Sequence, residues 1–392
     1  MSGTAEVISL GCRLNLAESE SIRNLLAGED VVVINSCAVT AEAVRQTRQA
    51  IRQARRRRPD ARLLVTGCAA EVEREALSAM PEVDGLIANA AKLDARAWNV
   101  AERFEPASHT HTRAFIAVQN GCDHACTFCI IPQGRGPSRS LPVPQVLRAI
   151  ERSPAAEVVL TGVDLTSWGH DLPQTDTGAP ALGVLVQAIL DAFPALHRLR
   201  LSSLDGVEID PLLFDLLADE PRVMPHVHLS LQHGHDLILK RMKRRHTRAD
   251  VVDLVARLKA RRPDIAIGAD LIAGFPTETP EHHAANRTVL ADLGVVHTHV
   301  FPYSPRPGTP AARMPQLAPA LIRERAAELR AEAARVRQDW LQSLVGSPLD
   351  VLTESDRTGY SPNFARVAVP AGTPRGTVVQ VTPTQCKEGL LQ

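Results

Sequence analysis

The chain has 392 residues, too many for one ordinary domain and enough for two or three. Its 44 basic and 44 acidic residues cancel, which excludes a chain that binds nucleic acid through an overall positive charge. No apolar run approaches the length of a membrane span and no secretory signal opens the chain, so we expect a cytoplasmic protein without a membrane contact.

Residues 1–90 alternate between apolar strands and amphipathic helices, the pattern of a parallel α/β domain. The expected strands are Glu6–Leu10, Val31–Ile34, Arg62–Val65 and Gly85–Ala88. The first three end at Cys12, Cys37 and Cys68. Because the carboxyl ends of parallel strands share one edge, we expect these thiols to lie together there. Ordinary buried cysteines are the alternative to a three-thiol iron–sulfur site.

A second group of cysteines lies in the loop Asn120–Ser140, where Cys122, Cys126 and Cys129 have the spacing C-x3-C-x2-C. Three thiolates leave one iron of a [4Fe–4S] cube without a protein ligand and open to a substrate. The loop is therefore interpreted as that of a radical S-adenosylmethionine (SAM) enzyme. The alternative is a structural zinc site, which needs four ligands and would have to recruit His124.

After a polar linker over residues 91–112, six strands alternate with helices and predict a partial (β/α)6 barrel, open on one side. The strands are Phe115–Gln119, Glu157–Thr161, Leu199–Ser203, His226–Gln232, Ile265–Leu271 and Val295–Tyr303. The helices are Val143–Arg152, Leu182–Ala192, Pro211–Asp219, Ala249–Ala260 and His282–Leu293. Because chemistry in such barrels sits at the carboxyl ends of the strands, the cysteine loop would lie over the mouth.

Several residues at or near the strand ends are candidates for SAM binding. A glycine allows close backbone approach and polar side chains offer hydrogen bonds, although ordinary strand-end hydrogen bonding explains the polar ones equally well. The candidates are Phe128, Thr161, Gly162, Asp164, Ser202 and Gln232.

The remaining segments are less specific. Residues 320–343 form a charged helix, interpreted as a solvated connector, and residues 344–382 read as a small antiparallel, barrel-like β module. Two basic runs, Arg55–Arg58 and Lys240–Arg245, could contact RNA locally or could simply be solvated helix ends.

The chain resembles the methylthiotransferases of the radical SAM superfamily over nearly its whole length. The resemblance rests on GCRLNLAESE at 11–20, NSCAVT at 35–40, TGCAA at 67–71, NGCDHACTFCIIPQGRG at 120–136, TGVDLTSWG at 161–169, LSLQHGHDLILKRMKRRHT at 229–247, DLIAGFPTET at 270–279 and HVFPYSPRPGTPAARM at 299–314. It implies a methylthiotransferase domain at 1–105, a radical SAM partial barrel at 112–340 and a TRAM-like module at 344–392.

The resemblance also implies two [4Fe–4S] clusters and SAM as cofactors. Cys122, Cys126 and Cys129 would hold the radical SAM cluster, and Cys12, Cys37 and Cys68 an auxiliary cluster that presents sulfur. No catalytic residue beyond these ligands is implied. We therefore expect the cysteine edge of the N-terminal domain to face the barrel mouth.

Within that family, GCRLN and HVFPYSPRPGTPAARM are most similar to the branch that adds a methylthio group at C2 of N6-threonylcarbamoyladenosine, at position 37 beside the tRNA anticodon. The other branches modify isopentenyladenosine of tRNA or an aspartate of a ribosomal protein. A metal-stabilised RNA-binding protein without catalysis is the alternative from another class. The expected partners are the tRNA anticodon loop and an electron donor such as flavodoxin or ferredoxin, with the enzyme a monomer.

Overall fold

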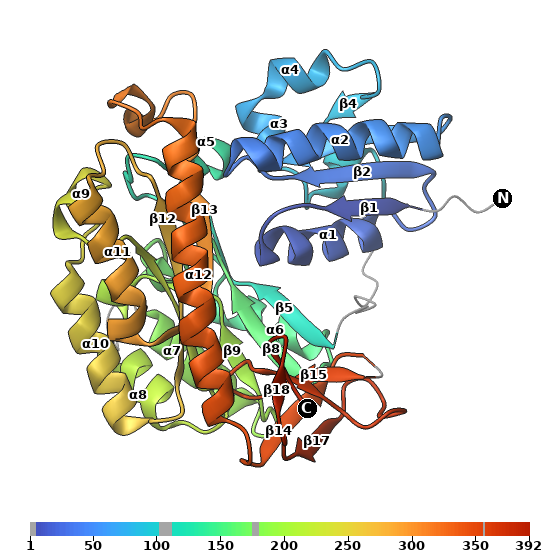
Figure 1. The fold of residues 1–392 in the computed structure, drawn as a ribbon. Helices are drawn as coiled ribbons and strands as arrows, with labels where there is room; N and C mark the ends of the chain where they lie inside the picture. Colours follow the sequence, from blue (N-terminus) through green and yellow to red (C-terminus); the bar gives the residue numbers. More distant parts are fainter. Residues whose placement is uncertain (1–4, 102–111, 175–179, 356) are drawn as a thin grey trace.

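The computed structural model describes residues 5–101, 112–174, 180–355 and 357–392, so part of the expected linker lies outside the described residues. An N-terminal α/β unit, a larger central barrel and a C-terminal β module follow one another along the chain (Figure 1). Within these ranges no helix combines the length and the apolar character needed to cross a bilayer.

The N-terminal unit contains the predicted all-parallel sheet, in the order β1-β2-β3-β4. Its strands are β1 (Glu6–Ser9), β2 (Val31–Ser36), β3 (Arg62–Gly67) and β4 (Gly85–Leu86). Its helices are α1 (Arg13–Leu25), α2 (Ala41–Arg57), α3 (Cys68–Val72), α4 (Arg74–Ser78) and the 3-10 turn η1 (Ala95–Trp98). All six residues of β2 are buried, because α1 and α2 cover opposite faces of the sheet.

The central barrel contains the six predicted strands, with two differences. The expected first strand ends at Ala117, and Gln119 belongs to β6, which pairs with β7. The expected third strand is interrupted at Ser202 into β9 and β10, because β9 pairs with β8 whereas β10 pairs with β11. The strands therefore form two sheets, β5-β8-β9 and β10-β11-β12-β13. Their bounds are β5 (Arg113–Ala117), β8 (Glu157–Thr161), β9 (Leu199–Leu201), β10 (Ser203–Leu204), β11 (His226–Gln232), β12 (Ala266–Ala273) and β13 (Val295–Pro302).

Helices and short elements complete the barrel around one large apolar core. Threonines cap two helices: Thr247 accepts from the Asp250 N–H at α10, and Thr279 from the His282 N–H at α11. The elements are β6 (Gln119–Asn120), α5 (Ile131–Arg135), β7 (Arg139–Ser140), α6 (Val143–Glu151), η2 (Leu165–Ser167), α7 (Leu182–Ala192), η3 (Gly206–Glu208), α8 (Pro211–Asp219), α9 (Asp236–Arg241), α10 (Arg248–Arg261), α11 (Pro280–Leu293) and η4 (Pro310–Arg313).

The charged helix α12 (Pro319–Ser343) is more than a solvated connector. It runs beside β13 (Figure 1) and buries Ile322, Leu329 and Leu341, while Arg335 pairs with acidic neighbours on its exposed face. Apolar residues at helical spacing within its charged sequence explain the packing.

The C-terminal module is a six-stranded sheet in the order β17-β14-β15-β16-β19-β18. Its pairing is antiparallel except between β16 and β19, which run parallel at Val367 and Leu391. The strands are β14 (Leu349–Thr353), β15 (Thr358–Tyr360), β16 (Arg366–Ala368), β17 (Val378–Val381), β18 (Cys386–Lys387) and β19 (Leu390–Leu391).

The module is joined to the barrel by arginines gathered around Glu157, whose side chain is fully buried at the start of β8. Arg113, Arg198 and Arg200 all donate to its carboxylate. Arg113 also pairs with Glu354 of the module, and Arg198 and Arg200 donate to backbone carbonyls there. These arginines hold the pKa of Glu157 far below its usual range although burial opposes this.

Candidate functional site

The loop that carries Cys122, Cys126 and Cys129 is held by backbone contacts with its surroundings. The Cys122 N–H donates to the Gly136 carbonyl (3.1 Å), and the Cys129 N–H donates to the Cys126 carbonyl (3.2 Å). Thr127 is tied to α9 through its N–H and its hydroxyl, at 3.1 Å and 2.8 Å. The thiols therefore occupy a defined loop between β6 and α5.

The other triad has the placement that the strand pattern predicts. Cys12 and Cys37 follow β1 and β2, and Cys68 opens α3 directly after β3. Gly11 brings the backbone close to Cys37, since a Cβ at Gly11 would lie 2.8 Å from the Cys37 sulfur. The parallel sheet thus collects three thiols at its carboxyl edge.

Both triads line one cavity of about 310 Å³ between the N-terminal sheet edge and the barrel mouth. The expected juxtaposition of the two edges is therefore confirmed. Besides the six cysteines, its wall includes Asn15, Val39, Thr40, His124, Phe128, Ile130, Ile131, Arg135, Gly162, Val163, Asp164, Ser203, Asp205, Ser230, Gln232, Arg244, Asp270, Ile272, Phe301, Pro302, Tyr303 and Ser304.

The donor set suits two clusters better than two zinc ions. All seven cysteines of the chain are free thiols. Tetrahedral zinc with 2.3 Å bonds would hold its sulfurs about 3.8 Å apart. Among the described residues, the groups of possible ligands within 4.8 Å of one another include neither thiol triad, although Cys122 groups with His124 and Asp164. Wider spacing is what a cubane requires, because each thiolate binds a different iron.

Local charge and hydrogen bonding also fit a cluster. Burial raises the pKa of Cys37 and of Cys129 to about 11, so thiolates here need a cationic centre. The Ile131 N–H lies 3.4 Å from the Cys129 sulfur, and an Arg244 N–H lies 3.5 Å from the Cys126 sulfur. Donors of this kind stabilise sulfur ligands and tune a cluster's potential.

The candidate SAM contacts separate into two groups. Four of the six candidate residues line the cavity: Phe128, Gly162, Asp164 and Gln232. Thr161 and Ser202 are buried outside the lining, where Ser203 takes the wall position next to Ser202. Gln232 has φ of +69°, a strained conformation for a non-glycine residue, at an irregularity in the β11–β12 register.

Gln119 binds the backbone of the loop that forms part of the cavity wall. Its position at a strand end was the only feature of the sequence that pointed to this role. Its side-chain oxygen accepts from the N–H groups of Val163 (3.0 Å) and Asp164 (2.9 Å). A Cβ at Gly162 would lie 2.8 Å from the same oxygen, so only glycine fits there. Gln119 thereby holds the loop after β8 against the cysteine loop.

His124 lies beside Cys122 and contacts an acid on the cavity wall. Its Nε2 lies 2.9 Å from Asp164 Oδ2, and this hydrogen bond raises the pKa of His124 to about 10. His124 therefore links the cysteine loop to Asp164 in the loop after β8.

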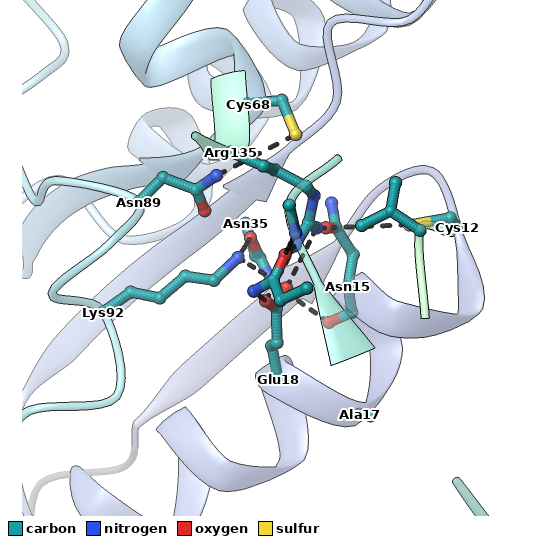
Figure 2. Close-up of polar contacts among 12 residues, drawn as sticks. Cys12, Asn15, Ala17, Glu18, Asn35, Cys68, Asn89, Lys92 and Arg135 are labelled. Carbon is teal, nitrogen blue, oxygen red and sulfur yellow. Dashed lines mark hydrogen bonds and ion pairs between the residues drawn. The ribbon is translucent and has the colours of Figure 1, made fainter. Parts of the chain in front are cut away.

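A buried polar network that no sequence pattern indicates joins the sheet edge to the cysteine loop. Figure 2 shows Arg135 and Lys92 converging on Glu18 of α1. Glu18 lies 3.0 Å from Arg135 and 2.5 Å from Lys92, and each of the three side chains is at most 2% exposed. Arg135 also donates to Asn15 and, at 2.7 Å, to Asn120. Because Arg135 ends α5, this network couples the two cysteine-bearing units.

Several arginines of the two basic runs have acidic partners. Arg55 pairs with Asp84, Arg57 with Glu6 and Arg58 with Asp30. Arg244 and Arg245 of the second run both pair with Asp205 beside the cavity.

A set on α2 that shares Arg56 with the first run, and that we call the α2 stripe, lines an open groove of about 600 Å³: Arg45, Arg48, Arg52 and Arg56. This spacing places four arginines along one helix face over about 16 Å. The first three also pair with acidic side chains.

Two protein-family models match this chain, one in the central barrel and one in the N-terminal unit. Residues 116–287 match the Radical SAM superfamily, and residues 4–88 match the Uncharacterized protein family UPF0004. A solved structure of the radical SAM methyltransferase TsrM from Kitasatospora setae aligns with a TM-score of 0.53 at 20% identity, over 72% of this chain and 64% of that one. This likeness shows the fold.

Relatives match over almost the entire chain. Threonylcarbamoyladenosine tRNA methylthiotransferase MtaB from Rickettsia prowazekii is 42% identical over 99% of this chain and 96% of the relative. MtaB from Aquifex aeolicus is 32% identical over 91% and 94%. The tRNA-2-methylthio-N(6)-dimethylallyladenosine synthase of Chloroflexus aurantiacus is 31% identical over 90% and 82%.

Proposed function

Because this chain belongs to the MtaB family of radical SAM methylthiotransferases, we propose that it inserts a methylthio group at C2 of N6-threonylcarbamoyladenosine at position 37 of tRNA. The observation that carries the proposal is the shared cavity of the two cysteine triads. A radical made at one triad can act on a substrate that receives sulfur at the other only if both open on the same space.

The residues have distinct roles in this proposal. Cys122, Cys126 and Cys129 would bind the radical SAM cluster, and Cys12, Cys37 and Cys68 the auxiliary cluster. When bound, the clusters and SAM supply an electron, a 5′-deoxyadenosyl radical, and the sulfur and methyl group to be transferred.

The chain itself would position SAM and keep the site dry. Phe128, Gly162, Asp164 and Gln232 would contact SAM from the wall, with Thr161 and Ser202 supporting it from behind. Apolar wall residues such as Ile272 and Phe301 exclude water from reactive species.

The relatives support the threonylcarbamoyl substrate over the isopentenyl (dimethylallyl) one. The two reactions share their chemistry and differ in the group carried by N6 of the adenine. The MtaB protein of Rickettsia prowazekii is 42% identical to this chain, whereas the dimethylallyladenosine synthase of Chloroflexus aurantiacus is 31% identical.

Nucleoside mass spectrometry of tRNA tests this function. A strain without the gene is expected to lose the methylthio form of threonylcarbamoyladenosine and to regain it with the wild-type gene. Persistence of that nucleoside in the deletion strain contradicts the assignment. Loss of the methylthio form of isopentenyladenosine, or of a mass increment on a ribosomal protein, would assign the other substrates.

The three structural units would divide the work. Residues 1–105 would form the methylthiotransferase domain, 112–340 the radical SAM barrel and 344–392 a TRAM-like module that grips RNA. The enzyme would work in the cytoplasm as a monomer that receives electrons from a flavodoxin or ferredoxin and binds the tRNA anticodon loop.

The α2 stripe is the surface best placed to hold the tRNA backbone. Helix α2 begins at Ala41, whose N–H donates to Ser304 on the cavity wall (3.0 Å). The stripe therefore leads away from the cavity rim, as the anticodon stem must when its loop enters the cavity. Arginines on one face bind phosphates through charge and bidentate hydrogen bonds.

Neutralising the stripe is expected to weaken tRNA binding and its salt dependence. A plot of log K for tRNA binding against log[salt] has a negative slope. In Arg52→Gln/Arg56→Gln the magnitude of this slope should decrease by about 2, because about one counterion is released per phosphate contact. The matched control is Arg257→Gln/Arg335→Gln, two exposed arginines on other helices. Equal slopes for the stripe variant and the wild type, measured by filter binding, would exclude this surface.

A further inference from the structure

Arg13 lies at the junction of all three units. It begins α1 directly after Cys12, which lines the cavity. Its guanidinium lies 5.5 Å from the centroid of the Phe364 ring, which belongs to the C-terminal module. Phe364 has φ of +71°, a left-handed conformation that is uncommon for a bulky residue. Arg13 therefore extends from the sheet edge into the space between barrel and module.

Arg13 differs from the other arginines around this ring. Arg113 and Arg200 also lie over Phe364, at 5.2 Å and 4.6 Å, but both are paired with the buried Glu157. The Arg13 guanidinium makes no hydrogen bond or ion pair with any residue that the structure describes. The guanidinium shares the Phe364 ring with two other cations, Arg113 and Arg200. A half-buried cation in this environment would be stabilised by an anion.

The ring under Arg13 is packed against the barrel strands. Phe364 contacts His226 of β11 and His297 of β13, at centroid distances of 5.4 Å and 5.9 Å. Residues two positions further along each strand point to the same face, about 6.6 Å away. The next layer of side chains toward the carboxyl ends is therefore His228 and His299.

That next layer contacts the cavity wall through Asp270. His228 Nε2 and His299 Nδ1 each lie 2.9 Å from Asp270 Oδ1, and Asp270 is part of the cavity wall. The His299 side chain is 63% exposed. The unpartnered guanidinium thus lies one layer from a cavity wall that already offers polar groups.

We propose that Arg13 forms a carboxylate-binding subsite, and that its ligand is the carboxylate of the threonylcarbamoyl group on the substrate adenosine. This inference rests on the proposed function and deepens it. The threonylcarbamoyl group is an anion with a hydroxyl, whereas the dimethylallyl group is uncharged and apolar. Guanidinium binds carboxylate in a bidentate geometry, and a buried polar group discriminates strongly against a ligand that lacks its partner.

The test pairs a protein change with a substrate change. The substrates are an anticodon stem-loop that carries threonylcarbamoyladenosine and the same stem-loop with its carboxylate converted to a neutral methylamide. Wild-type enzyme should favour the acid by roughly 10- to 100-fold in kcat/KM and in binding, the range for hydrogen bonds to a charged group. Arg13→Met should lose this preference, and Arg13→Lys should keep part of it.

The controls separate the possible failures. Arg23→Met alters the last turn of the same helix, where Arg23 donates to the Val7 carbonyl, and should keep the preference. Iron content and SAM cleavage report whether each variant retains an intact Cys12 site. Wild-type enzyme that converts acid and methylamide equally, or Arg13→Met that keeps the full preference, would overturn the inference. Wild-type enzyme that converts neither stem-loop would instead overturn the proposed function.

Discussion

Cys68→Ala is expected to lower the iron content from about eight to about four per chain and to abolish formation of the methylthio product, while SAM cleavage continues. The reason is that Cys68 belongs to the sheet-edge triad and the radical loop has its own three thiols. Iron analysis of anaerobically purified protein, SAM cleavage under reductant and nucleoside mass spectrometry give the three readouts.

Two further variants make this test specific. Cys129→Ala should also halve the iron content but should abolish SAM cleavage as well as the product. Cys386→Ala should change none of the three, because this thiol lies on β18 in the C-terminal module. Zinc in place of iron, or product formed by Cys68→Ala, would contradict the two-cluster assignment.

Glu18→Gln is expected to lower the free energy of unfolding by about 3–5 kcal/mol, since it leaves buried cations without their counter-charge. Lys92 and Arg135 both depend on this carboxylate, and each is at most 2% exposed. The network also sets how the sheet edge meets the cysteine loop. A displacement of about 1 Å between reacting groups can reduce a rate on the order of 10²-fold. Product formation should therefore fall by this factor, while SAM cleavage remains close to wild type.

Denaturant unfolding and the two activity assays measure these effects. Asp253→Asn is the control, because its pair with Arg257 is exposed and should contribute no more than about 1 kcal/mol. The double variant Glu18→Gln/Lys92→Met removes one unpaired cation and should recover part of the stability. Equal loss of SAM cleavage and product formation in Glu18→Gln would show that the network does not act through the alignment of the two units.

The buried network around Glu18 also predicts how the free energy of unfolding depends on pH. Although burial opposes it, the charges of Lys92 and Arg135 hold the pKa of Glu18 below its usual value. A lowered pKa contributes stability above the unfolded value of about 4.3, and this contribution is lost as the pH falls through the folded pKa. The stability difference between wild type and Glu18→Gln should therefore narrow below about pH 4.

The sequence by itself determined the features that depend on local pattern. Alternating strands and helices predicted the parallel sheet, and the rule that parallel strands end at one edge placed Cys12, Cys37 and Cys68 together. The spacing of Cys122, Cys126 and Cys129 marked the second thiol group within a single loop. Both predictions hold because spacing along a strand or loop directly sets position in space.

Only the tertiary structure decided which distant side chains meet. Glu18 and Arg135 are 117 positions apart, and no periodicity relates them. The block Arg55–Arg58 was a plausible RNA patch by composition, yet several of its charges are paired with acids from other strands and turns. The α2 stripe was found instead because its arginines line an open groove, although Arg45, Arg48 and Arg52 are also paired with acids.

Arg13 shows the same limit most clearly. In the sequence it is the arginine of the GCRLN motif, and nothing there shows which side chains surround it. In the structure it is a half-buried guanidinium over Phe364, while its neighbours Arg113 and Arg200 are held by Glu157. A charge without a partner is a property of its surroundings, and those surroundings come from three parts of the chain that meet only in the folded protein.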